Sequence, residues 1–419
     1  MSRRDFLEDF VGTSLWSVVP AKRRFRYRKD SNAGMKESHR LALTMGGVID
    51  RSLDDTDGLQ SSDYGSYQIF EKGDLAFKLI DLQNIKTSRV GLVPRRGIMS
   101  PAYIRLTPTS DGVYPEFFYW YFYAAYLGNI FNGLGGGIRQ NLSQTELLEF
   151  PVPDIPTEDQ TAIARFLDRE TGRIDGLIEK KSRFIALLKE KILGFSDSCV
   201  TGRDNSQRGL KDVDIPWAPR IPEGWTVRKG KHLFEEMARP VGPDDEIITA
   251  FRDGQVCLRS KRRTEGYTFA EKEVGYQRIL KGDLVIHTMD AFAGAIGVSE
   301  DDGKATGEYA VCKPRSDEAV PEYYAYLLRC MARRNYIYVL CPSVRERAPR
   351  FRFVRFAPVK LPVPPREEQL EIVDRIESAT ARMKNLISLT ERSIDLLREK
   401  RAALITAAVT GKIDVRAAA

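Results

Sequence analysis

The amino-acid sequence contains an internal repeat, and this repeat constrains the fold more than any other feature. Trp16 and Trp225 lie 209 positions apart (225 − 16). The same offset joins Lys72-Gly73-Asp74 to Lys281-Gly282-Asp283, Gln160 to Gln369, and Val200-Thr201-Gly202 to Val409-Thr410-Gly411. Collinear matches at one offset predict two copies of one structural unit. The alternative is an old duplication without present meaning.

The offset drifts in two places, which indicates loop insertions. Pro115-Glu116 matches Pro321-Glu322 at an offset of 206 (321 − 115). Pro151-Val152-Pro153 matches Pro362-Val363-Pro364 at an offset of 211 (362 − 151). Each copy opens with short β-rich runs among glycines and aromatic residues, and each closes with a long helical pattern. Proline before each helical pattern and acids such as Glu158 and Glu367 in its first turn are typical of helix starts.

Apolar residues in both helical patterns recur every three and four positions, as they do in a coiled coil. We expect these residues to pack along the helix seam: Ile163, Leu167, Ile174, Leu177, Leu188, Ile372, Ile376, Met383, Leu386, Leu397 and Leu404. The most direct way to bury two such seams is to pair the helices. The alternative is two separate amphipathic helices, each packed on its own domain.

The connection between the copies favours an antiparallel pair, because a parallel pair would need a linker that runs back along the coil. We therefore predict an α+β protein, pseudo-two-fold symmetric, with two similar α/β domains separated by a long antiparallel two-helix coiled coil. The expected boundaries are 1–155 and 203–363 for the domains, and 156–202 and 364–414 for the helices. A helix of about 40 residues is roughly 60 Å long. Domains held at its two ends suit two DNA half-sites about one turn, roughly 34 Å, apart.

Charge favours a polyanionic partner, with a net charge of +7 and a pI of about 9.0. Arginine can bind guanine with two hydrogen bonds, glutamine and asparagine can bind adenine, and basic clusters bind phosphates. The candidate DNA-binding residues are Arg23, Arg24, Arg26, Arg28, Lys29, Arg139, Gln140, Asn141, Arg259, Lys261, Arg262, Arg263, Arg345, Arg347, Arg350 and Arg352. A charge run that only solvates one face is the alternative for each cluster.

The sequence offers little to an enzyme or a metalloprotein. Five scattered cysteines and three histidines have no metal-ligand spacing, so no metal site is expected. Val363-Pro-Pro-Arg366 lacks the polar and aromatic residues of a methyltransferase motif, and no phosphate-binding GxxxxGK[ST] loop occurs. We expect no catalytic residue and no cofactor. An odd number of scattered cysteines suits a reducing compartment, and we find no signal peptide and no apolar run long enough to cross a bilayer. We therefore expect a cytoplasmic protein without a membrane partner.

Several motifs resemble those of the specificity subunits of type I restriction-modification systems. They are Ile221-Pro-Glu-Gly-Trp225, Val363-Pro-Pro-Arg-Glu-Glu-Gln369, Ile394-Asp-Leu-Leu-Arg-Glu-Lys-Arg-Ala-Ala-Leu-Ile405 and Ala408-Val-Thr-Gly-Lys-Ile-Asp414. The resemblance covers nearly the whole chain. Phe195-Ser-Asp-Ser-Cys199 departs from the pattern and leaves the end of the first helix open.

This resemblance implies two target recognition domains on spacer helices, which bind double-stranded DNA. It also implies two methyltransferase (modification) subunits and restriction (translocase/nuclease) subunits as partners, so that catalysis lies outside this chain. We therefore expect a sequence-specific DNA-binding specificity subunit that reads a bipartite target. The competing hypothesis is a coiled-coil adaptor whose heads bind nucleic acid without sequence preference.

Overall fold

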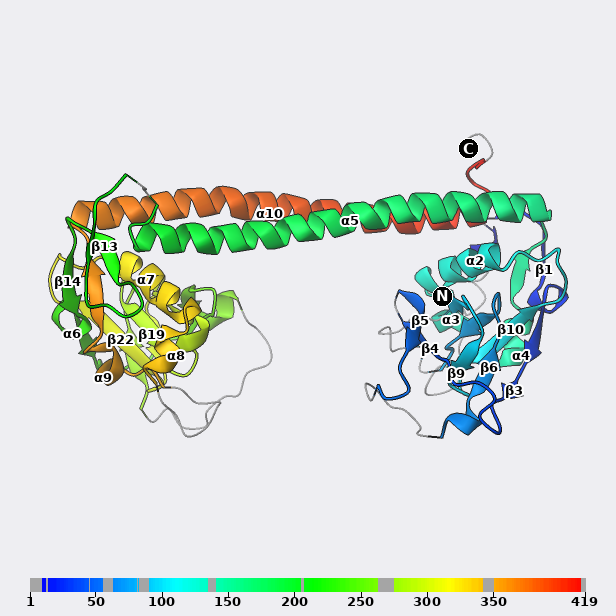
Figure 1. Ribbon diagram of the computed structural model, residues 1–419, viewed down its shortest axis with the longest axis horizontal. Coiled ribbons are helices and arrows are strands. Elements are labelled where there is room, and N and C mark those ends of the chain that lie inside the picture. The colour runs from blue at the N-terminus through cyan, green and yellow to red at the C-terminus, as the bar shows by residue number, and fades with distance from the viewer. Residues whose placement is uncertain are drawn as a thin grey trace. The chain divides into compact units, whose positions relative to one another are not determined.

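The computed structural model describes residues 10–12, 14–44, 46–55, 63–80, 82, 90–134, 141–204, 207–262, 275–341 and 350–415. The chain divides into two compact units, Met1–Ser182 with Glu391–Ala419, and Arg183–Thr390. Unit 1 holds the first head, which precedes the first long helix. Unit 2 holds the second head, which lies between the two long helices in sequence (Figure 1).

The first head is built on an antiparallel four-stranded sheet in the order β2-β10-β7-β8. These strands are β2 (Phe25–Arg28), β10 (Ile104–Pro108), β7 (Leu75–Phe77) and β8 (Val90–Leu92). Helix α2 (Pro115–Leu127) packs on one face, with the Phe25 and Phe118 ring centroids 5.1 Å apart. A second, five-stranded sheet has the order β3 (Asp30–Ser31), β6 (Gln68–Phe70), β9 (Gly97–Met99), β4 (Arg40–Thr44) and β5 (Gly47–Arg51). The head is completed by β1 (Val18–Pro20) paired with β11 (Pro151–Pro153), and by α3 (Ile130–Leu134) and α4 (Gln144–Leu148).

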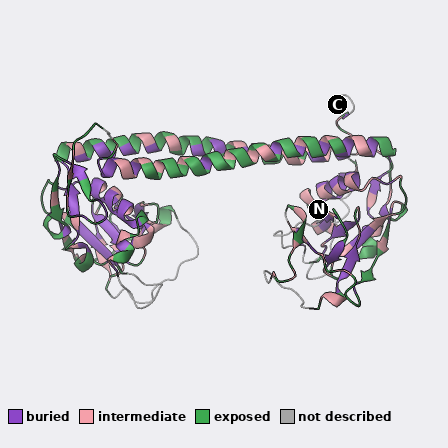
Figure 2. Ribbon diagram, viewed as in Figure 1, coloured by how far each residue is buried: buried purple, intermediate pink, exposed green. Residues whose placement is uncertain are grey.

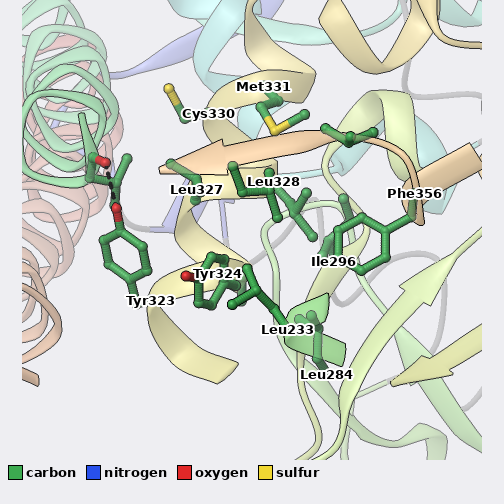
Figure 3. Close-up of a cluster of buried hydrophobic side chains, with 14 of the residues drawn as sticks. Leu233, Leu284, Ile296, Tyr323, Tyr324, Leu327, Leu328, Cys330, Met331 and Phe356 are labelled. Carbon is green, nitrogen blue, oxygen red and sulfur yellow. Dashed lines mark hydrogen bonds between the residues drawn. The ribbon is translucent and has the colours of Figure 1, made fainter. Parts of the chain in front are cut away.

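The second head repeats the four-stranded sheet in the order β15-β22-β19-β20. Its strands are β15 (Phe234–Met237), β22 (Tyr309–Pro314), β19 (Leu284–His287) and β20 (Ile296–Val298). Helix α7 (Pro321–Arg333) supplies buried residues to the core, including Tyr324, Leu327 and Leu328 (Figure 3). The remaining elements are β12 (Leu210–Asp212) with β13 (Arg220–Pro222), β14 (Thr226–Lys229) with β23 (Lys360–Val363), β16 (Ile248–Ala250) with β17 (Val256–Leu258), β18 (Gln277–Ile279) with β21 (Gly303–Ala305), α6 (Gly230–Leu233), η3 (Arg259–Lys261), η4 (Ala291–Ala293), α8 (Tyr336–Val339) and α9 (Phe353–Phe356).

The two heads share details as well as strand order, so the duplication has a structural meaning and the α+β prediction is confirmed. Asp74 accepts a hydrogen bond from the Glu71 backbone N–H at 2.7 Å, and its counterpart Asp283 accepts one from Leu280 at 2.8 Å. The glycine before each aspartate has a positive φ, which closes the turn without steric cost. The side chain of Gln160 accepts a hydrogen bond from the Tyr114 N–H at 2.8 Å, and that of Gln369 accepts one from Val320 at 2.9 Å.

One sequence match is wrong by two residues. The structure pairs Val19 with Val152 and Arg228 with Leu361. Because Val19 and Arg228 are 209 apart (228 − 19), Leu361 rather than Val363 corresponds to Val152. The offset therefore stays at 209 near this strand. The identical Pro-Val-Pro letters produced a slipped alignment.

An ion pair with a buried aspartate anchors the Lys-Gly-Asp turn in each head, but its cation comes from different segments of the fold. In the first head, Arg105 on β10 lies 2.5 Å from Asp74 and 2.7 Å from Asp30. In the second head, Arg239 pairs with Asp283, with one of its contacts at 3.1 Å. Arg239 stands where the first head has Asp30 (239 − 30 = 209). A buried carboxylate needs such a partner, since burying an unpaired charge is costly.

The two long helices are α5 (Thr157–Val200) and α10 (Arg366–Val409), each of 44 residues. In unit 1 the first part of α5 shares a core with the last part of α10, and Asp175 lies 2.9 Å from Arg401. In unit 2 the end of α5 shares a core with the start of α10. The helices are therefore antiparallel within each unit, as predicted. They do not pack as separate amphipathic helices.

Burial along the helices corrects part of the predicted seam (Figure 2). Ile163, Leu167, Ile174, Ile372 and Ile376 are buried, and Leu188, Met383, Leu397 and Leu404 are half-buried. Leu177 and Leu386, expected in the seam, are 38% and 41% exposed. Ile185, Ile387 and Ile394 are buried instead. Buried positions step by eleven from Ile174 to Ile185 and from Ile376 to Ile387, which corresponds to about 3.67 residues per turn rather than the 3.5 of a heptad pattern.

The repeated Val-Thr-Gly motif ends each long helix and fits it against a tryptophan. Gly202 has φ +66°, and a Cβ there would lie 2.3 Å from the Pro222 Cγ and 3.1 Å from the Trp225 ring. Gly411 has φ +79°, and its Cβ would lie 2.7 Å from the Trp16 ring. The Tyr323 hydroxyl donates a hydrogen bond to the Val200 carbonyl at 2.9 Å, which is the dashed line in Figure 3. The motif therefore marks where each helix docks on a head, and α5 ends at Val200.

Candidate nucleic-acid interface

The basic run of the first head lies mostly on β2, an edge strand of the four-stranded sheet. Phe25 and Tyr27 pack on the core below α2. Arg26 and Arg28 alternate with them and are exposed, because successive strand residues point to opposite faces. The side chains of Arg26, Arg28 and the adjacent Lys29 have no ion-pair or hydrogen-bond partner among the residues that the structure describes. These three cations are available to phosphates.

Two neighbours in the same run behave differently from each other. Arg24 is half-buried and forms an ion pair with Asp154. Arg23 is exposed at the end of the 3-10 turn before β2, without a side-chain partner in the described part of the chain. Sequence reasoning treated the run as one cluster, but the structure pairs Arg24 with Asp154 and leaves Arg23, Arg26, Arg28 and Lys29 without a side-chain partner among the described residues.

The second head's predicted cluster around η3 is largely paired with its own acids. Lys261 Nζ lies 2.5 Å from Asp301, and Arg262 lies 2.7 Å from Asp253 with its guanidinium 4.2 Å from the Phe251 ring centroid. The hydrogen bond to Asp301 raises the pKa of Lys261, and the same bond lowers the pKa of Asp301. Arg259 donates a hydrogen bond to the Thr249 hydroxyl at 3.0 Å. Charge counted from the sequence therefore overstates what this cluster offers to a phosphate.

The late cluster is only partly described. Arg350 lies 3.1 Å from Glu308, whereas Arg352 is exposed and has no side-chain partner among the described residues. Asn141 is exposed in the first head. The other candidates lie outside the described residues: Arg139, Gln140, Arg263, Arg345 and Arg347.

The structure also presents cations that sequence reasoning missed. Arg355 on α9 is exposed, without a side-chain partner in the described ranges. A cleft of about 770 Å³ within unit 2 is lined by Lys189, Lys281 and Lys384, with Glu322 and Glu377 on the same walls. Lys189 and Lys384 come from α5 and α10, and Lys281 comes from the Lys-Gly-Asp turn, so only the folded chain brings them together.

The described residues contain no group of three or more His, Cys, Asp or Glu side chains able to hold a metal ion. None of their helices combines the length and apolar character that crossing a membrane requires. The described surface offers exposed arginine and lysine side chains on two similar heads, which suits binding to a polyanion.

Sequence comparison finds a relative but no family model. No family model matches the chain. The type I restriction enzyme EcoBI specificity subunit of Escherichia coli is 24% identical over 289 residues. The match spans 64% of this chain and 59% of that relative's own length. The match therefore covers less than two thirds of that relative.

Solved structures share the fold. A chain from a structural study of complex assembly and conformational transition of the type I R-M system superposes with a TM-score of 0.63 at 14% identity, covering 95% of this chain and 98% of that one. The HsdS subunit from Thermoanaerobacter tengcongensis gives a TM-score of 0.51 at 14% identity, covering 95% of this chain and 97% of that one. The resemblance to type I specificity subunits is therefore confirmed in sequence and in fold.

Proposed function

We propose that this protein is the DNA-specificity subunit of a type I restriction-modification enzyme and reads a bipartite target. The two heads, residues 1–155 and 203–363, act as target recognition domains, and the helical segments 156–202 and 364–414 act as spacers. The observation that carries this proposal is that both heads use one scaffold but expose different side chains. A shared scaffold with different surfaces suits two similar readers of two different half-sites.

The difference between the surfaces is clear at the edge strand of the four-stranded sheet. Where the first head has the exposed Arg26 on β2, the second head has the half-buried Glu235 on β15 at the same offset, and Met237 at the position of Arg28 packs on an apolar cluster. A cation that binds phosphate in one head is thus an acid in the other. The two half-sites then need not be copies of each other.

In this proposal the chain carries no catalytic residue, and the chemistry resides in partners. The resemblance supports two methyltransferase subunits and restriction subunits as those partners, with double-stranded DNA as the ligand. The spacers set the separation of the half-sites, since an α-helix adds about 1.5 Å per residue and cannot shorten. The competing adaptor function would give nucleic-acid binding with steep salt dependence but no sequence preference.

The decisive experiment reads the methylated DNA motif in cells that express the chain with its methyltransferase subunits. Replacing residues 203–363 with the second head of another specificity subunit is expected to change one half of the motif and to keep the other half and the spacing. The unmodified chain serves as the control. A change in both halves, or methylation without any sequence preference in the unmodified complex, would contradict the proposal.

A further inference from the structure

The second head exposes a group of large apolar side chains between η4, α8 and α9. Met289 is 37% exposed, Tyr338 47%, Val339 69% and Val354 71%. Isolated apolar residues on a surface need no explanation, whereas exposed apolar residues on adjoining segments of one head indicate a contact site. We call this group, together with Arg352 and Arg355, the α8–α9 surface.

Contacts within the head hold the α8–α9 surface together. The Tyr338 ring packs against Phe292 of η4 with centroids 6.2 Å apart. The Phe351 N–H donates a hydrogen bond to the Thr288 carbonyl at 2.9 Å, which places the start of α9 beside Met289. Burial raises the pKa of the Cys341 thiol, which follows α8, and the positive charge of Arg355 on α9 opposes this rise.

Charge on this surface favours an anionic ligand. Arg352 and Arg355 have no side-chain partner among the described residues. The nearby acids are already engaged, since Glu308 lies 3.1 Å from Arg350 and Asp290 lies 3.1 Å from Arg252. The surface thus combines exposed apolar groups with two free guanidinium groups.

The first head has the same backbone here but different side chains. Asn129 and Asn335 both have a positive φ just before α3 and α8, which fixes the correspondence of these helices. The Leu142 N–H bonds to the Leu79 carbonyl at 3.0 Å, as Phe351 does to Thr288, which fixes the second correspondence. The first head accordingly has these residues at the matching positions: Asn132 for Tyr338, Gly133 for Val339, Ser143 for Arg352, Thr145 for Val354 and Glu146 for Arg355.

Those first-head residues serve the local fold. The Ser143 hydroxyl caps α4, and the Glu146 carboxylate accepts a hydrogen bond from the Ser143 N–H at 2.8 Å. Arg352, at the position of Ser143, makes no such side-chain cap on α9. Tyr338, Val339, Val354 and the two arginines are therefore not required by the scaffold that both heads share, whereas Met289 has an exposed apolar counterpart in Ile80.

We propose that the α8–α9 surface reads base pairs in the half-site of the second head, with Val339 and Val354 against thymine methyl groups and Arg352 and Arg355 on flanking phosphates. This inference rests on the proposed function and names the reading surface of one head. Apolar side chains discriminate thymine through its 5-methyl group in the major groove, whereas arginines on phosphates position the protein without reading sequence. The first head, with Asn132 and Thr145 in place of Tyr338 and Val354, would read its half-site through other contacts.

The test measures binding of the full chain, assembled with its methyltransferase subunits, to its target duplex. Thymines in the half-site of the second head are replaced one at a time by deoxyuracil, which removes only the methyl group. At a contacted thymine we expect about a fourfold loss of affinity, the value of one buried methyl group. In the double variant Val339→Thr/Val354→Thr, which keeps the side-chain shape, the thymine duplex binds more weakly and deoxyuracil causes no further loss.

A matched control and the remaining outcomes make the test specific. Val241→Thr changes a valine that is 37% exposed elsewhere in the second head and is expected to behave like the unmodified chain. We expect all variants to fold, because the substituted valines are exposed, and thermal unfolding checks this. An unchanged deoxyuracil penalty in the double variant would overturn the inference, and so would loss of methyltransferase assembly with normal DNA binding. If the unmodified complex itself shows no sequence preference, the proposed function fails instead.

Discussion

The salt dependence of DNA binding tests whether the structure identifies the correct phosphate-binding cations. Arg26, Arg28 and Lys29 in the first head are free, whereas Lys261, Arg262 and Arg350 in the second head are paired with acids. Both sets were equivalent candidates in the sequence. We therefore compare the triple variant Arg26→Gln/Arg28→Gln/Lys29→Gln with the triple variant Lys261→Gln/Arg262→Gln/Arg350→Gln, which removes the same charge.

The expected magnitude follows from counterion release. Each phosphate contact contributes about 0.9 to the slope of log affinity against log salt, so three contacts contribute about 2.7. Between about 50 and about 200 mM salt, those contacts account for roughly a 40-fold loss of affinity. The first triple variant should lack this part of the loss. The second should keep nearly all of it, because those cations already have internal partners.

The assay is fluorescence anisotropy of a short labelled duplex with the full chain, repeated across a salt series. Removing a paired cation also leaves the charge of its acidic partner uncompensated. A control variant, Lys261→Gln/Asp301→Asn, therefore removes both charges of one ion pair. That control keeps the net charge and is expected to leave the slope unchanged. Equal slopes for the two triple variants, or an unchanged slope in the first, would refute the assignment of free and paired cations.

Two further predictions concern stability. Gly202→Ala is expected to destabilise unit 2 by more than about 1 kcal/mol, because φ is +66° and the added Cβ would lie 2.3 Å from Pro222. Gly176→Ala on α5, where the added Cβ would meet no atom within 4 Å, should stabilise the helix by about 1 kcal/mol. Thermal unfolding measures both variants, and a shift of the same sign in the two would contradict this prediction. Burial lowers the pKa of His287, with Asp290 and Glu308 opposing the shift and Arg252 adding to it. As the pH falls below about 6.5, the imidazole is protonated in the unfolded chain before it is protonated in the folded one, so acid destabilises the fold. His287→Gln should therefore weaken the fall in unfolding midpoint between neutral and mildly acidic pH. An unaltered pH dependence would argue against a neutral buried imidazole.

The repeat and the long helices were predictable because they are properties of neighbouring residues. The offset between Trp16 and Trp225 and the three-to-four spacing of apolar residues can be read without knowing any long-range contact. Even there the prediction failed in detail. A strict seven-residue pattern placed Leu177 and Leu386 in the seam, whereas the structure buries Ile185 and Ile387, eleven residues after Ile174 and Ile376.

The candidate interface depended on tertiary structure to a much larger degree. Lys261 and Asp301 are separated by 40 positions, and the packing of β17 and β20 brings their charges together. Arg352 and Arg350 are neighbours in sequence, yet only Arg350 meets a carboxylate. No local pattern distinguishes a free cation from a paired one, because the acidic partner belongs to a segment that is distant in the sequence.

The sequence by itself thus determined that this protein has two similar heads on two long helices and which residues carry positive charge. Tertiary structure decided which of those charges remain available and which apolar side chains stay exposed, as at Val339 and Val354. The physical reason is that periodicity and capping are set by residues within a few turns of one another. Neutralisation and burial are set by contacts that form only when distant segments pack.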